Sequence, residues 1–192
     1  MSGQSIFKPI YDEYAVDFFR RRGWQSCAVR KRGWYCDVIA VKTAEIALVE
    51  VKTPVERSTG SDYDDMAKLD PGLVSQFPSD FRGRRRRIFY RIPRRRGVSL
   101  VKLYAVSIGC QLFRYLKEFE YKRSQYAAAA QGIQIPALGQ YTLKGFLAVP
   151  IEAKSQCRRS IDLLRSDGIV ASTVEEEDCK LFCTEVSFRG GL

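Results

Sequence analysis

Two carboxylates and a lysine fall on consecutive apolar runs of this 192-residue chain. Asp37 lies within WYCDVIAV, and Glu50-Val51-Lys52 ends the next run, EIALVEVK. Both runs are rich in β-branched and aromatic residues, which predicts the two strands of a hairpin. If Thr43-Ala44 is a two-residue turn, the antiparallel register places Asp37 opposite Glu50, with Cβ atoms about 5 Å apart.

These charges are unusual because both faces of the second run are apolar. Side chains alternate along a strand, so Ile46 and Leu48 share a face with Glu50 and Lys52. Apolar residues on both faces are typical of a central strand that is covered on both sides. Glutamate and lysine are rarely buried there unless they are paired or bind a metal. The alternative is that the strand runs out into solvent at Glu50. We favour the interpretation in which Asp37, Glu50 and Lys52 converge in one site.

Asp37, twelve intervening residues and Glu50-Val51-Lys52 resemble the signature of the PD-(D/E)XK nuclease superfamily. That superfamily contains restriction endonucleases, archaeal Holliday junction resolvases, RecB-type nuclease domains and many viral nucleases. The resemblance covers about residues 6–52, although Cys36 rather than proline precedes the aspartate. It implies catalytic roles for Asp37, Glu50 and Lys52, and a 5′-phosphate product.

The resemblance also points to three further residues. Glu13, on the expected first helix, could be an additional catalytic acid, with surface charge as an equal alternative and Asp12 and Asp17 as competitors. Gln111-x3-Tyr115 is similar to the Q-x3-Y motif of RecB-type nucleases, although 58 residues separate it from Lys52. An ordinary amphipathic helix is the favoured explanation of that pair. Many of the resembled families are dimers, so a homodimer is a further expectation.

The composition favours a nucleic-acid partner. The chain has 32 Lys and Arg against 22 Asp and Glu, a net charge of +10, which suits a polyanion. It has no histidine, which excludes Ser-His and Cys-His nucleophile pairs and His-ligated zinc. No apolar run reaches 18 residues, and the N-terminus lacks the apolar core of a signal peptide. We therefore expect no membrane segment and an intracellular, cytoplasmic protein.

A dense arginine cluster strengthens the expectation of a nucleic-acid partner. Nine arginines occur within fifteen residues, interleaved with Phe81, Phe89 and Tyr90. The arginines are Arg82, Arg84, Arg85, Arg86, Arg87, Arg91, Arg94, Arg95 and Arg96. Arginine binds phosphates through bidentate hydrogen bonds, and aromatic rings can stack on unpaired bases. The cluster is therefore predicted to contact nucleic acid; a solvated basic loop or a contact with an acidic partner is the alternative.

The pattern of elements predicts an α/β fold in a single domain, residues 1–192. The expected elements are a helix at 6–22, strands at 24–30, 34–42 and 45–52, a short helix near 64–76, a hairpin of 87–92 and 98–108, a helix at 110–130, a strand at 141–149, a helix at 153–167, and strands at 169–174 and 180–188. This order resembles the restriction endonuclease-like core, α-β-β-β-α-β-α-β, in which helices flank a mixed central sheet. The stretch at about 53–108 would be a basic insertion.

Two cysteines flank the first expected turn. Cys27 and Cys36 are symmetric about Lys31-Arg32, so a tight hairpin there would make them cross-strand neighbours. They could form a disulfide, or they could be two small buried hydrophobic residues, which is the favoured interpretation.

The chemistry predicted from these residues is phosphodiester hydrolysis. Asp37, Glu50 and the backbone carbonyl of Val51 are hard oxygen ligands, which suit Mg²⁺ or Mn²⁺. Lys52 could orient the attacking water or hold the scissile phosphate. The expected function is that of a Mg²⁺-dependent deoxyribonuclease, with endonuclease action preferred. The alternatives are a nuclease-fold regulator or assembly factor that binds nucleic acid without cleaving it, and a basic module for RNA or an acidic protein.

Overall fold

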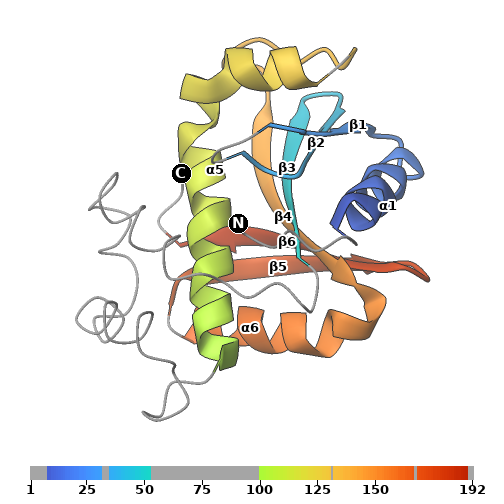
Figure 1. Ribbon diagram of the computed structural model, residues 1–192. Coiled ribbons are helices and arrows are strands. Elements are labelled where there is room, and N and C mark those ends of the chain that lie inside the picture. Colours follow the sequence, from blue (N-terminus) through green and yellow to red (C-terminus); the bar gives the residue numbers. More distant parts are fainter. Residues whose placement is uncertain (1–7, 32–34, 53–99, 131, 167, 190–192) are drawn as a thin grey trace.

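A computed structural model describes residues 8–31, 35–52, 100–130, 132–166 and 168–189 of the chain. Within these residues it shows an α/β fold with a six-stranded mixed sheet and three α-helices (Figure 1). In chain order the elements are α1 (Lys8–Arg20), β1 (Gln25–Ala28), β2 (Val38–Lys42), β3 (Glu45–Val51), α5 (Leu100–Ala129), β4 (Thr142–Pro150), the 3-10 helix η2 (Ile151–Ala153), α6 (Lys154–Ser166), β5 (Val170–Glu177) and β6 (Leu181–Phe188).

The sheet has the strand order β1-β2-β3-β4-β6-β5. Strand β3 pairs with β4 in parallel, and the other neighbours are antiparallel. A parallel neighbour needs a crossover connection, and α5 lies in the one between β3 and β4. Strand β3 therefore has a hydrogen-bonded neighbour on each side, as expected for a central strand.

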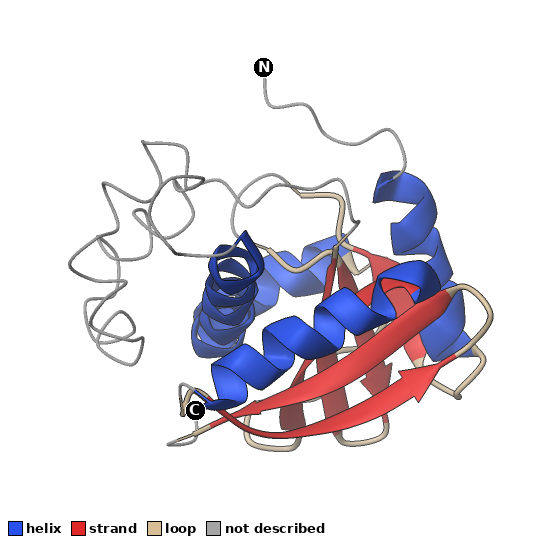
Figure 2. Cartoon of the chain, turned by 90° about the horizontal axis from the view of Figure 1, so that it is seen from below, coloured by secondary structure: helices blue, strands red, loops and turns tan. Residues whose placement is uncertain are grey.

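Helices cover both faces of the sheet (Figures 1 and 2). Helix α1 packs Val16, Phe18 and Phe19 against the face that carries the odd-numbered residues of β3, such as Val49. Helices α5 and α6 share a core with the opposite face, which carries Ile46 and Leu48 of β3. The alternation predicted from the sequence is confirmed, and Glu50 lies on the α5 face because it follows Ile46 and Leu48 at a spacing of two.

Helix α1 has a clear end in the sequence. Gly23 follows its last turn with a φ of 81°, a left-handed conformation that glycine adopts without a steric penalty. The backbone N–H of Gly23 donates to the carbonyl of Arg20, which closes the helix and turns the chain into β1.

One expected strand is wrong. The sequence predicts a hairpin strand at 98–108, but α5 already begins at Leu100. A short apolar run such as LVKLYAV is compatible with both the strand period of two residues and the helix period of about 3.6 residues. Gly109 lies inside the helix instead of separating two elements. The expected short helix at 64–76, the strand at 87–92 and most of the basic insertion lie outside the described residues.

The expected pairing of Cys27 with Cys36 is also wrong. Cys27 lies opposite Ile39, and the pairing continues with the N–H of Val29 donating to the carbonyl of Asp37 at 2.7 Å. The β1–β2 pairing is therefore not symmetric about Lys31-Arg32. Both cysteines are thiols without a disulfide, and both pack against the α5-side core as small hydrophobic residues.

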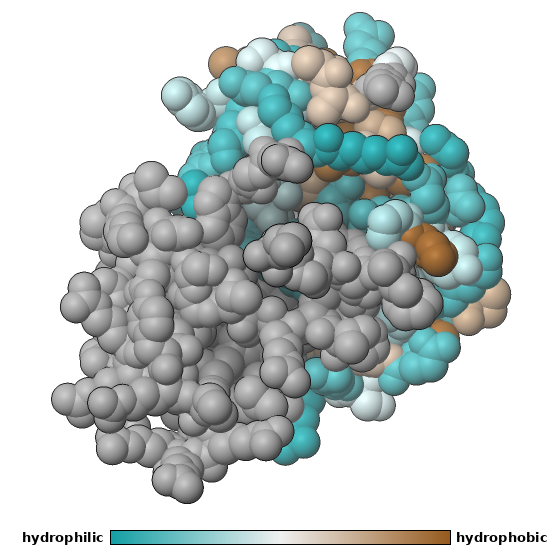
Figure 3. Space-filling model, in the orientation of Figure 1, coloured by the Kyte–Doolittle hydropathy of each residue, from teal (hydrophilic) through white to brown (hydrophobic). Residues whose placement is uncertain are grey.

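The described surface in the view of Figure 3 is mainly hydrophilic, with hydrophobic residues in small groups. Within the described residues, no helix has the length and apolar character needed to cross a membrane.

Candidate active site

The β2–β3 hairpin has the register predicted from the sequence. Lys42 pairs with Glu45 across the Thr43-Ala44 turn, and Val38 pairs with Val49. Asp37 immediately precedes β2, and its backbone N–H donates to the carbonyl of Val49 at 2.9 Å. Asp37 and Val38 thus share Val49 as their partner on β3, as at a β-bulge, so the regular register ends at Val38 and the expected direct pairing of Asp37 with Glu50 is shifted by one residue.

Backbone groups hold Asp37 at the end of β3. Its Oδ2 accepts a hydrogen bond from the Val51 N–H at 2.8 Å. The N–H of the next residue, Lys52, donates to the Ala148 carbonyl on β4 at 2.9 Å. Since N–H and C=O of one strand residue point toward the same neighbour, the Val51 carbonyl lies on the Asp37 side. The expected ligand oxygens of Asp37 and Val51 are thus on one side of β3.

Glu50 is buried and forms an ion pair with Lys52. Its residue surface is 3% exposed, and its Oε1 lies 2.7 Å from the Lys52 Nζ. The Lys52 side chain is itself only 13% exposed. A buried carboxylate needs such a partner because its desolvation is costly. The alternative in which β3 runs out into solvent at Glu50 therefore does not hold.

Helix α5 adds a tyrosine to this site. Tyr115 lies close enough to Glu50 and Asp37 for their charges to act on its hydroxyl. Burial raises the pKa of Tyr115 well above its usual value, and the negative charges of Glu50 and Asp37 raise it further. The phenol therefore stays protonated at neutral pH. Gln111, one turn earlier on the same face of α5, is buried as well.

The wall beside Asp37 is formed by Cys36 and Tyr126. The backbone N–H of Cys36 donates to the Tyr126 hydroxyl at 3.2 Å. Burial raises the pKa of the Cys36 thiol, and the Tyr126 hydroxyl opposes this effect only in part. The thiol is therefore uncharged at neutral pH and unsuited to nucleophilic chemistry. These contacts fix the backbone from which the Asp37 side chain projects.

Helix α1 carries three candidate acids on the other side of the sheet. Glu13 is exposed and lies 2.7 Å from Nη2 of Arg30. Asp17 is 4.0 Å from Arg20, while Asp12 is half-buried. No contact in the described part of the chain joins Glu13 to the Asp37–Glu50 pair, so its catalytic role stays a prediction. The nine arginines between Arg82 and Arg96 lie outside the described residues.

The oxygen atoms present fit a hard divalent cation. Within the described residues, no three His, Cys, Asp or Glu side chains come together in a metal-binding cluster. Asp37 and Glu50 provide two carboxylates, and the Val51 carbonyl is a third oxygen on the same side. Mg²⁺ keeps several waters and is commonly bound by one or two carboxylates together with substrate phosphates. The donor set therefore suits Mg²⁺ or Mn²⁺ and not a soft metal.

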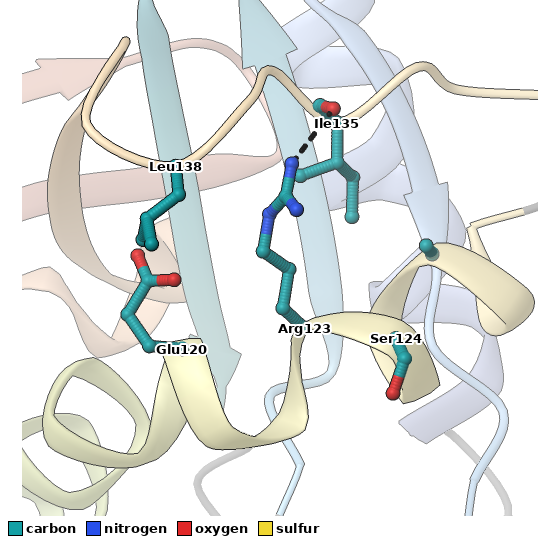
Figure 4. A pocket seen from close by; sticks show the side chains of 6 residues that line it. Glu120, Arg123, Ser124, Ile135 and Leu138 are labelled. Carbon is teal, nitrogen blue, oxygen red and sulfur yellow. Dashed lines mark hydrogen bonds between the residues drawn. The ribbon is translucent and has the colours of Figure 1, made fainter.

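A separate cavity lies between α5 and the segment that leads to β4 (Figure 4). Its volume is about 410 Å³, and it is lined by Glu120, Arg123, Ser124, Ala127, Ile135 and Leu138. The guanidinium of Arg123 donates to the carbonyls of Ile135, at 3.3 Å, and Pro136. Arg123 thus ties the segment to the helix, and none of the carboxylates of the Asp37–Glu50 site lines this cavity.

Tyr115 is a residue near Glu50 whose position the sequence did not specify. Its signal was the Q-x3-Y spacing, but an ordinary amphipathic helix has the same spacing of large side chains.

No protein-family model matches the chain, and no curated protein and no solved structure shows significant similarity to it.

Proposed function

We propose that this protein is a metal-dependent nuclease that hydrolyses phosphodiester bonds in DNA. The observation that carries the proposal is the convergence of Asp37, Glu50 and Lys52 at the end of an otherwise apolar hairpin, with Asp37 bonded to the Val51 N–H and Glu50 buried against Lys52 at 2.7 Å. Two carboxylates and an ammonium in such a position are costly to the fold, which argues for a role in chemistry.

The arrangement of elements supports a restriction endonuclease-like core for this activity. An antiparallel β1-β2-β3 meander follows α1, and a crossover containing α5 leads to the parallel strand β4. This agrees with the order expected from the resemblance; Asp37 immediately precedes the second strand, and Glu50 lies on the third. Strands β5 and β6 extend the same sheet beyond β4.

Each residue of the site has a distinct task in the proposed reaction. Asp37, Glu50 and the Val51 carbonyl would hold Mg²⁺ or Mn²⁺, which would acidify a water and offset negative charge at phosphorus. Lys52 would donate to the scissile phosphate or orient the attacking water. Tyr115 would hold the Glu50 carboxylate, and the Val51 N–H holds that of Asp37.

The net charge of +10 supports nucleic acid as the substrate class. Because phosphate contacts by Lys and Arg release counterions, binding should weaken steeply with salt. DNA is the favoured substrate through the resemblance described above.

A panel of end-labelled DNAs tests the proposed function. Single strands, duplexes, flaps and four-way junctions are incubated with the full chain in Mg²⁺, in Mn²⁺ and in EDTA. Cleavage that depends on the metal and leaves 5′-phosphate ends is the expected result. Tight binding of the panel without any cleavage would favour the non-cleaving nucleic-acid-binding protein instead. Absence of both binding and cleavage would overturn the proposal altogether.

A further inference from the structure

Two lysine ammonium groups approach the ring of Tyr35. Nζ of Lys31, from the segment between β1 and β2, lies 4.9 Å from the ring centroid. Nζ of Lys122, from α5, lies 5.0 Å from the same centroid. Each contact alone is an ordinary cation–π interaction. The convergence of two cations from distant parts of the chain on one ring is less ordinary, because the two charges repel each other.

This cluster borders the Asp37–Glu50 site. Tyr35 precedes Asp37 by two residues, and its ring packs edge-on against Tyr126 with centroids 5.2 Å apart. The Tyr126 hydroxyl in turn accepts the backbone N–H of Cys36, the neighbour of Asp37. Tyr35 and its two lysines therefore lie next to the acid pair, on the side of the sheet that α5 covers.

Charges on α5 continue this cluster. Glu118 forms ion pairs with two cations of α5. Its Oε1 lies 2.7 Å from Nε of Arg114, and its Oε2 lies 2.5 Å from Nζ of Lys122. One carboxylate is thus divided between two cations, and Lys31 adds a third charge nearby. The Lys122 side chain is only 15% exposed, so it is already positioned and loses little freedom on binding an anion. Lys31 is exposed and can reach toward a ligand.

We propose that Lys31 and Lys122, assembled on Tyr35, form a subsite for a backbone phosphate of nucleic acid beside the Asp37–Glu50 site. A bound anion would offset the repulsion between the two ammonium groups, and lysine is a strong point-charge partner for phosphate. The identity of the ligand as a nucleic-acid strand rests on the proposed function. The subsite would fix the position of the strand relative to the carboxylates without reading its sequence.

Charge-neutral variants test the subsite. Lys31→Gln, Lys122→Gln and the double variant are compared with Lys117→Gln as the matched control. Lys117 is an exposed lysine on the same helix, and its ammonium lies over another aromatic ring, Phe113, at 5.4 Å. Phe113 packs against Phe188 of β6, so this control removes an equal charge on the β6 side of α5.

Binding of a fluorescein-labelled duplex is measured by anisotropy from 50 to 300 mM salt, with Ca²⁺ in place of Mg²⁺. The double variant is expected to bind severalfold more weakly and to lower the slope of log K against log salt by about 0.9, the value for one neutralised phosphate of duplex DNA. Lys117→Gln should keep the wild-type slope. A scan with single methylphosphonate linkages should show one position that weakens the wild type but not the double variant, because the double variant no longer binds that phosphate.

The outcomes separate this inference from the proposed function. A double variant with the slope of Lys117→Gln and an unchanged methylphosphonate profile overturns the subsite, even if the wild type cleaves DNA. The expected slopes together with a wild type that fails to cleave in Mg²⁺ support the subsite and remove the nuclease proposal. Lys31→Gln alone, at an exposed position outside the Glu118 contacts, decides the question if thermal melting shows that the double variant is unfolded.

Discussion

Each charge of the site is held by a different neighbour. The Val51 N–H bonds Asp37, while Lys52 and Tyr115 both approach Glu50. Since Glu50 is 3% exposed, its carboxylate depends on these partners for its stability in the fold. Substitutions of Lys52 and Tyr115 should therefore change the cleavage rate and the free energy of unfolding by amounts that can be measured separately.

Lys52→Met is expected to abolish cleavage and to lower the free energy of unfolding by about 2–3 kcal/mol, because it leaves the Glu50 charge without its ammonium partner. The double variant Lys52→Met/Glu50→Gln should recover much of the stability and none of the activity. Urea denaturation of the two variants measures this coupling. Equal destabilisation in the single and double variants would contradict the ion pair.

Tyr115→Phe removes only the hydroxyl that faces Glu50. Cleavage is expected to fall roughly ten- to hundredfold through misplacement of the carboxylate, with about 1 kcal/mol lost in stability. Tyr121→Phe is the matched control, since Tyr121 is on the same helix and 85% exposed. Single-turnover kinetics compare the two variants. If both cleave at the wild-type rate, Tyr115 is a core residue and not a positioning residue.

At the scale of the elements, the sequence predicted the β2–β3 hairpin because two apolar runs are joined by a two-residue turn. Such a turn leaves one register that keeps Ile46 and Leu48 in the core. The β1–β2 connection is longer, so the symmetric placement of Cys27 and Cys36 did not determine its register. The place of Tyr115 over Glu50 depends on how α5 crosses the sheet, which no local pattern of residues contains.

The β5–β6 turn provides a prediction on stability and pH. Burial alone would raise the pKa of Asp178, but hydrogen bonds from the N–H groups of Leu181 and Lys180, with the charge of Arg21, hold it below its usual value. A carboxylate of this kind stabilises the fold above its unfolded pKa of about 3.9, and the contribution is lost as the pH falls through the folded pKa.

Asp178→Ala should therefore destabilise the protein by about 1–2 kcal/mol at pH 7, and the difference from the wild type should shrink below pH 4. Chemical denaturation at pH 7, 4.5 and 3 measures it, with Asp162→Ala as a control because Asp162 is 66% exposed on α6. A constant difference at all three pH values would show that the charge of Asp178 does not contribute.

At the scale of the whole molecule, the proposed binding of nucleic acid depends on the distribution of positive charge more than on any single interaction. The segment Arg82–Arg96 is predicted from the sequence to be the principal electrostatic contact, and it lies outside the described residues. Replacing Arg84–Arg87 with alanine is expected to weaken binding to all DNA sequences alike. It should also lower the salt slope by about 0.9 for each phosphate that the variant no longer neutralises.

Cleavage at saturating DNA should fall less than affinity does in this variant, because the proposed chemistry belongs to the β2–β3 hairpin. Anisotropy titrations at several salt concentrations, together with single-turnover rates, distinguish the two effects. Unchanged affinity and an unchanged slope would assign the arginines to a solvated loop or to a contact with an acidic partner.

The most direct test of the central claim is the single-turnover cleavage rate of Asp37→Asn and Glu50→Gln in Mg²⁺. Both variants keep an oxygen acceptor for the Val51 N–H or for Lys52 and Tyr115, so the fold should persist. The rate should fall roughly a thousandfold or more in each, while Asp162→Asn cleaves like the wild type. Full activity in Asp37→Asn or Glu50→Gln, or undiminished wild-type activity in EDTA, would contradict the account.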